Sequence, residues 1–92
     1  MIRTFRHKGL EEVFETGTSR KVPAEMLKRI EARLDVLDAA QTISGVNAPG
    51  FGLHPLKGNR SGEWAITVTG NYRITFRFES GNALDVNLED YH

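Results

Sequence analysis

The sequence contains no cysteine, so neither a disulfide framework nor a thiolate zinc site can form. This composition favours a reducing cytoplasm as the natural setting. No apolar run approaches the roughly 18 residues that would span a bilayer. The cations Arg3, Arg6 and Lys8 are not followed by the apolar segment of a secretory signal. We therefore expect a soluble, cytoplasmic protein that does not associate with membranes.

The chain also lacks a net charge, because 12 Lys and Arg residues balance 12 Asp and Glu residues. Proteins that bind nucleic acid usually have a basic balance. Residues 1–8 carry three cations and no acid, whereas the acidic excess lies in residues 9–40. Any surface that binds RNA must therefore be a local patch. The length of 92 residues predicts one domain, residues 1–92, with modest stability.

Two helices are predicted before residue 41. Apolar residues at Leu10, Val13 and Phe14 follow helical spacing, and Gly17 stands where a left-handed residue commonly ends a helix. Pro23 is favoured at the first position of a helix, which we expect to continue to about Ala40. This second helix carries one apolar stripe for the core, made of Leu27, Ile30, Leu34 and Leu37.

The apolar period changes to two in the second half of the chain, which predicts three antiparallel strands with one buried face. A short strand over residues 1–6 is expected to precede the helices, and residues 41–52 to form a loop. The residues assigned to the buried face are Trp64, Ile66, Val68, Tyr72, Ile74, Phe76, Phe78, Leu84, Val86 and Leu88.

The register of the first hairpin follows from this pattern. A two-residue turn at 70–71 would pair Val68 with Arg73 and set a charge against the core residues. A three-residue loop, 69–71, pairs Thr67 with Arg73 and keeps the apolar residues on one face. The other face is then polar, either an ordinary solvated surface or a ligand groove, and carries Thr67, Arg73, Thr75, Arg77 and Asn87.

The last three residues place a carboxylate, a phenol ring and an imidazole side by side. An imidazole transfers protons near neutral pH, cations bind a phosphate, and an aromatic ring stacks on a nucleobase. A frayed strand end would look the same in sequence. If the last three residues share one groove with residues 54–58 and with Arg73, they form an RNA-cleaving site. The members of this site would be His54, Lys57, Arg73, Asp90, Tyr91 and His92.

The chain closely resembles the HigB branch of the RelE/ParE toxin superfamily. The resemblance implies an α+β fold in which two N-terminal helices pack on one face of a curved, mainly antiparallel β-sheet. It covers nearly the whole chain, including residues 1–8 and 22–24, and rests mainly on Gly52-Leu-His-Pro-Leu-Lys-Gly58, Trp64-Ala-Ile-Thr-Val68, Asn71-Tyr-Arg-Ile-Thr-Phe76 and Glu89-Asp-Tyr-His92.

The resemblance implies an endoribonuclease that cuts messenger RNA in the ribosomal A site, without metal or cofactor, through attack of the ribose 2′-hydroxyl on the adjacent phosphate. Asp90 or His54 is expected to take the 2′ proton, and His92 to protonate the leaving oxygen. Lys57 and Arg73 would stabilise the phosphorane. The ring of Tyr91 would stack on a displaced base, while further phosphate contacts would come from Lys8, Arg60 and Arg77.

The implied partners are a HigA-type antitoxin with a helix-turn-helix domain, the ribosome and messenger RNA. Operator DNA would be reached only through the antitoxin. Two other functions stay open from the residues. One is inhibition of DNA gyrase without nuclease activity, as in the ParE branch, and the other is a corepressor that only binds. His7 fits no role in this set.

Overall fold

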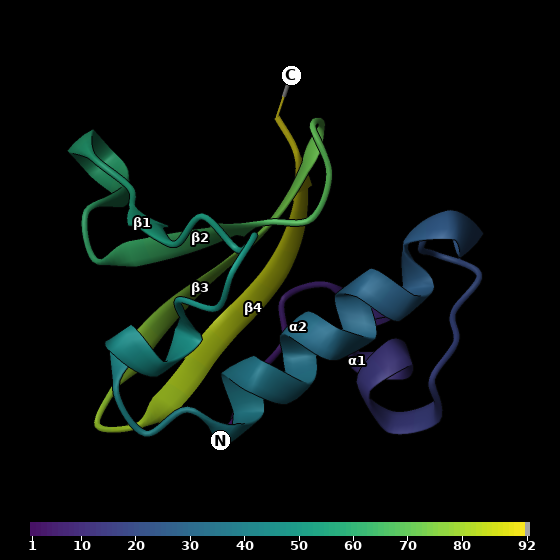
Figure 1. Ribbon diagram of the computed structural model, residues 1–92, viewed down its shortest axis with the longest axis horizontal. Coiled ribbons are helices and arrows are strands. Elements are labelled where there is room, and N and C mark those ends of the chain that lie inside the picture. The colour runs from purple at the N-terminus through teal and green to yellow at the C-terminus, as the bar shows by residue number, and fades with distance from the viewer. Residues whose placement is uncertain (92) are drawn as a thin grey trace.

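Two helices cover one face of an open, four-stranded sheet in the computed structural model of the protein, which describes residues 1–91 (Figure 1). The strands lie in the order β1-β2-β3-β4, and each neighbouring pair is antiparallel. The predicted α+β fold is confirmed. The elements are α1 Lys8–Thr16, η1 Ala24–Met26, α2 Leu27–Ala39, η2 Ile43–Val46, β1 His54–Pro55, η3 Gly58–Arg60, β2 Glu63–Thr67, β3 Tyr72–Glu79 and β4 Asn82–Asp90.

Helix α1 begins and ends with well-formed caps. His7 accepts a hydrogen bond at Nδ1 from the Leu10 amide, 3.2 Å away, so this imidazole is the N-cap. Burial, and then the charge of Lys21, lower the pKa of His7, which keeps the capping nitrogen unprotonated near neutral pH. Gly17 ends the helix with a left-handed φ of 84°, as predicted, and its amide donates to the Val13 carbonyl.

Helix α2 lies across the sheet and supplies much of the core. Pro23 precedes a single 3₁₀ turn, so the α-helix itself starts at Leu27 and not at the proline. Arg29 and Arg33 donate to the carbonyls of Val68 and Thr67, at 2.9 and 2.6 Å, and so tie the helix to the end of β2. The predicted stripe is confirmed, because Ile30, Leu34 and Leu37 are fully buried and Leu27 is half-buried.

The predicted register of the β2–β3 hairpin is also confirmed. Thr67 pairs with Arg73, and Trp64 pairs with Phe76. The loop between the strands has three residues, 69–71, since the Val68 amide donates to the Tyr72 carbonyl at 2.9 Å. The apolar residues of both strands therefore face the helices, and the opposite face is left for polar side chains.

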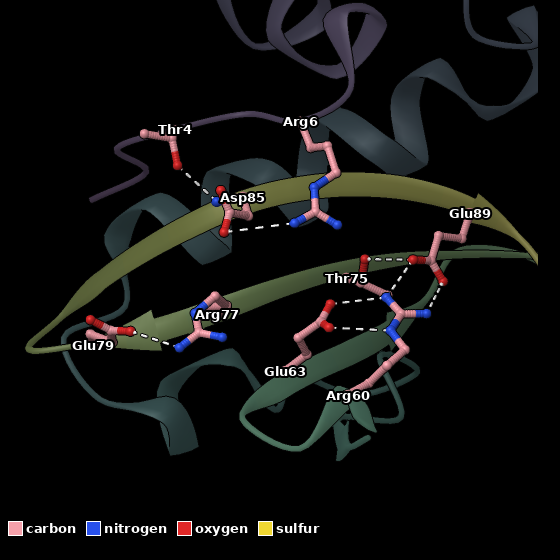
Figure 2. Close-up of polar contacts among 9 residues, drawn as sticks. All are labelled: Thr4, Arg6, Arg60, Glu63, Thr75, Arg77, Glu79, Asp85 and Glu89. Atoms are coloured by element: carbon pink, nitrogen blue, oxygen red, sulfur yellow. Dashed lines mark hydrogen bonds and ion pairs between the residues drawn. The ribbon is translucent and has the colours of Figure 1, made fainter. Parts of the chain in front are cut away.

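One predicted strand face is wrong. A β-bulge shifts the β3–β4 register, so Arg77 pairs with Leu84 and Ala83 takes the buried position. The extra residue is Asp85, whose φ is 53°. Leu84 consequently shares the face of Arg77 and not the core face predicted for it. The Asp85 amide donates to Thr4 Oγ1 at 2.8 Å (Figure 2).

The N-terminal segment lies beside β4 without forming the predicted strand. Isolated parallel bridges join Ile2 to Ala83 and Phe5 to Val86, on either side of the bulge, which interrupts the ladder between them. The two-residue strand β1 at the opposite edge was not predicted. None of the helices within residues 1–91 is long and apolar enough to cross a membrane.

Candidate active site

The face of the sheet away from the helices carries three of the predicted site residues, His54, Arg73 and Arg77. Residues that pair across antiparallel strands project from the same face. One cross-strand row contains Thr67, Arg73 and Glu89. The next row contains His54, Ala65, Thr75 and Asn87. Four strands thus place His54 of β1 and Arg73 of β3 on one surface, one row apart.

A carboxylate and two guanidinium groups form the centre of this surface. Glu89 Oε1 accepts from Arg73 Nε at 3.2 Å and lies 3.1 Å from Arg73 Nη2. Arg60 binds both oxygens of Glu89, at 3.0 and 2.5 Å, and also binds Glu63 at 2.9 and 3.2 Å (Figure 2). The hydroxyl of Thr75, a residue only 1% exposed, donates to Glu89 at 3.2 Å. We call these five side chains the Glu89 cluster.

The charged side chains of the Glu89 cluster are paired with one another. Hydrogen bonds from Arg60 lower the pKa of Glu89 to about 2; burial opposes this shift, and Arg73 adds to it. Arg60 likewise lowers the pKa of Glu63, and the two carboxylates raise the pKa of Arg60. Two cations therefore face two anions, which agrees with the neutral charge of the chain. Around Arg73 the polar face of the sheet is a paired network, and the Arg73 side chain is 18% exposed.

Tyr91, the residue after β4, lies against the guanidinium of Arg73. Its ring centroid lies 4.6 Å from Arg73 Cζ, a cation–π distance, and its amide donates to the Asn71 carbonyl at 2.9 Å. The C-terminal end accordingly lies beside the β2–β3 turn (Figure 1). Asp90 is exposed and pairs with Tyr72. His92 lies outside the described residues.

His54 is oriented by a contact with the backbone of Gly52. Its Nδ1 lies 2.9 Å from the Gly52 carbonyl oxygen. A carbonyl oxygen can only accept a hydrogen bond, so Nδ1 donates it, and Nε2 is the ring nitrogen that this contact does not engage. Gly52 adopts a left-handed φ of 59°, which an L-residue with a side chain rarely takes. The imidazole of His54 is exposed on the short strand β1.

The remaining predicted cations lie in three parts of the fold: the η3 turn, the open face of the sheet and the helix layer. Lys57 is exposed at the N-cap of the η3 turn, and the same turn ends at Arg60. Arg77 lies on the open face, paired with Glu79 at 3.3 Å. Lys8 begins α1 in the helix layer, where its ammonium is 3.4 Å from Glu11. The structure thus brings Arg60 and Arg73 into direct contact with one carboxylate and leaves Lys8 in the other layer.

Comparisons with known proteins identify the family of the chain. Residues 3–92 match the family described as "RelE-like toxin of type II toxin-antitoxin system HigB". The chain belongs to the HigB-like toxin family. It is 50% identical to "Endoribonuclease HigB" of Proteus vulgaris over 92 residues, with 100% of both chains covered. It is 32% identical to "Toxin HigB-1" of Vibrio cholerae over 93 residues, covering 99% of this chain and 98% of that protein.

Membership of the family confirms the resemblance noted in the sequence. As a toxin of a type II toxin–antitoxin system, this HigB-like chain has an antitoxin as its partner. Among residues 1–91, no group of three histidine or acidic side chains is placed to hold a metal ion.

Sequence reasoning missed Glu89 as a residue of the site in this HigB-like toxin. In the strand pattern it reads only as one more polar residue of β4. Glu89 lies opposite Arg73 in the β3–β4 pairing, a register that the sequence analysis did not predict. The pairing of Arg60 with Glu63 at i, i+3 gave no signal either, since η3 was not predicted.

Proposed function

We propose that this chain is a cytoplasmic endoribonuclease toxin that cuts messenger RNA on the ribosome, and that residues 1–92 act as one domain. The proposal is supported by the 50% identity to a protein named as an endoribonuclease over the whole of both chains. The structural observation that supports it is the sheet face away from the helices, on which the register puts His54 of β1 and Arg73 of β3, with the Tyr91 ring against the Arg73 guanidinium.

The reaction needs one base, one acid and stabilisation of the phosphorane. The O2′–phosphorus bond forms as a base removes the 2′ proton, and the phosphorus–O5′ bond breaks as an acid protonates O5′. The products are a 2′,3′-cyclic phosphate and a 5′-hydroxyl. His54 is our preferred base, since the Gly52 carbonyl engages Nδ1 and would leave Nε2 to take the proton. Asp90 is the second candidate, and His92 is our candidate acid.

Cations and the aromatic ring would hold the substrate. Arg73 and Lys57 would stabilise the equatorial phosphate oxygens in the transition state. Tyr91 is 41% exposed, which leaves part of its surface for stacking on a base. Arg77 would contact a phosphate further along the open face. Lys8 and Arg60, the other predicted phosphate contacts, are engaged by Glu11 and by the Glu89 cluster.

The antitoxin would be of the HigA type, with a helix-turn-helix domain that binds operator DNA. The chain itself would reach that DNA only through the antitoxin.

A cell-free translation reaction tests this function. Purified protein should truncate a translated message at codon boundaries, with cut sites mapped by primer extension, and should leave an untranslated message intact. An intact message together with inhibition of gyrase supercoiling would favour the ParE-like alternative. An intact message without any supercoiling effect would leave the corepressor function.

A further inference from the structure

The Glu89 cluster contains a charged group for which the proposed chemistry has no direct use. Glu89 is 19% exposed, and its two oxygens accept hydrogen bonds from Arg60, Arg73 and Thr75. A carboxylate so enclosed by donors is held in one position. It cannot serve as a proton acceptor near neutral pH, because Arg60 lowers the pKa of Glu89 to about 2.

The geometry of Arg73 shows what this carboxylate fixes. A guanidinium has five N–H donors arranged in a rigid plane. Arg73 directs Nε and Nη2 at Glu89 Oε1, so one edge of the plane is occupied. The Tyr91 ring lies over its Cζ and covers one flat side. The Nη1 edge is left to bind a phosphate oxygen, in the orientation that Glu89 sets.

Arg60 completes the arrangement by holding Glu89 itself. It binds both carboxylate oxygens and is anchored in turn by Glu63 from β2. Glu89 is therefore clamped from a second direction and cannot follow Arg73 if that side chain moves. Arg60 has Nε, Nη1 and Nη2 directed at carboxylates, so its role here is to position Glu89.

We propose that Glu89 is a positioning residue for the cleavage reaction, which orients the Arg73 guanidinium toward the scissile phosphate and is itself held by Arg60. This inference rests on the proposed endoribonuclease function. It differs from a purely structural role because the effect of Glu89 on cleavage should pass through Arg73 alone.

The test is a double-mutant cycle on ribosome-dependent cleavage, with Glu89→Gln, Arg73→Ala and the combination. A neutral amide offers one acceptor oxygen where the carboxylate offers two, so Arg73 loses its fixed orientation. Glu89→Gln alone should lower kcat by about 10²-fold, the scale of misplacing a reacting group by an ångström. KM should stay the same or fall, since an anion is removed beside the RNA. In the Arg73→Ala background the same substitution should change kcat by less than about 2-fold.

Glu12→Gln is the matched control. It neutralises a paired carboxylate of helix α1, which binds Lys21 and Ser19, and leaves the contacts of Glu89 in place. Its kcat should stay within about 2-fold of the wild-type value. The Nε–Hε signal of Arg73 in a nitrogen–proton NMR spectrum, assigned with Arg73→Lys, gives a readout independent of cleavage. It should shift and broaden in Glu89→Gln and stay unchanged in Glu12→Gln.

The possible results distinguish a failure of this inference from a failure of the proposed function. Wild-type kcat in Glu89→Gln, or an unchanged Arg73 signal, would overturn the inference and leave the proposed function intact. An equal fold loss in the wild-type and Arg73→Ala backgrounds would also overturn it, because Glu89 would then act through the fold. If the wild-type protein cut no message at all, the proposed function would fail first.

Discussion

Stability at acid pH should depend on Glu89 more than on any other carboxylate of the open face. Its pKa in the folded protein is about 2, against an ordinary value of 4.5, with hydrogen bonds from Arg60 as the main cause. At about 1.36 kcal/mol per pKa unit, the ionised carboxylate contributes about 3 kcal/mol to the free energy of unfolding. This value applies to a side chain only 19% exposed, which limits screening by solvent.

The sign of the pH dependence follows from the lowered pKa. The contribution is fully present above pH 4.5 and is lost as the pH falls toward 2, where the folded protein also takes up the proton. Glu89→Gln should therefore be less stable than wild type by about 3 kcal/mol at pH 6, and the two proteins should converge as the pH approaches 2. Protonating Glu89 at low pH has the same effect as replacing it.

Urea unfolding at several pH values, followed by the fluorescence of the single tryptophan, Trp64, measures this directly. The control is Glu79→Gln, which removes an exposed ion pair with Arg77 and should cost less than about 1 kcal/mol at any pH. If the stability difference between Glu89→Gln and wild type stayed constant across pH 2–6, the carboxylate charge would not be the source of the stabilisation.

Four further outcomes are expected. Arg73→Ala should cost about 2 to 4 kcal/mol of transition-state stabilisation in message cleavage and should destabilise the fold less than Glu89→Gln, because Arg60 still neutralises Glu89. Deletion of His92, or His92→Gln, should leave ribosome binding intact and reduce cleavage by about 10²- to 10⁴-fold. Asp85→Val should lower the free energy of unfolding by about 1 to 3 kcal/mol relative to Asp85→Gly, because both lose the contact with Arg6 but only valine is strained at a φ of 53°. Expression in a host without a cognate antitoxin should arrest growth, and coexpression of the antitoxin should restore it.

The hairpin register could be predicted because a wrong register would have set Arg73 against the core residues. The helices could be predicted because their apolar spacing is regular and Gly17 ends the first of them, whereas Pro23 precedes a 3₁₀ turn and not the α-helix itself. These features depend on residues close together in sequence or on the separation of charge from the core.

The bulge at Asp85 could not be predicted from the alternation, because a single extra residue leaves the polar and apolar pattern almost unchanged while it exchanges the faces of Ala83 and Leu84. The contacts within the Glu89 cluster could not be predicted either, for a different reason. Arg60 and Glu89 are 29 positions apart, and sequence does not specify which carboxylate a long cationic side chain will reach. The sequence therefore predicted the β2–β3 register and did not predict the contacts of the Glu89 cluster.

In the proposed reaction, the open face promotes attack by the ribose 2′-hydroxyl on the scissile phosphate. The most direct measurement uses a ribosome-bound message that carries one 2′-deoxynucleotide on the 5′ side of a mapped cut site. We expect no cleavage at that bond, unchanged cleavage at other sites, and a 2′,3′-cyclic phosphate at each cut of the all-ribose message. Cleavage at the 2′-deoxy position would rule out this mechanism, because that nucleotide lacks the hydroxyl that acts as the nucleophile.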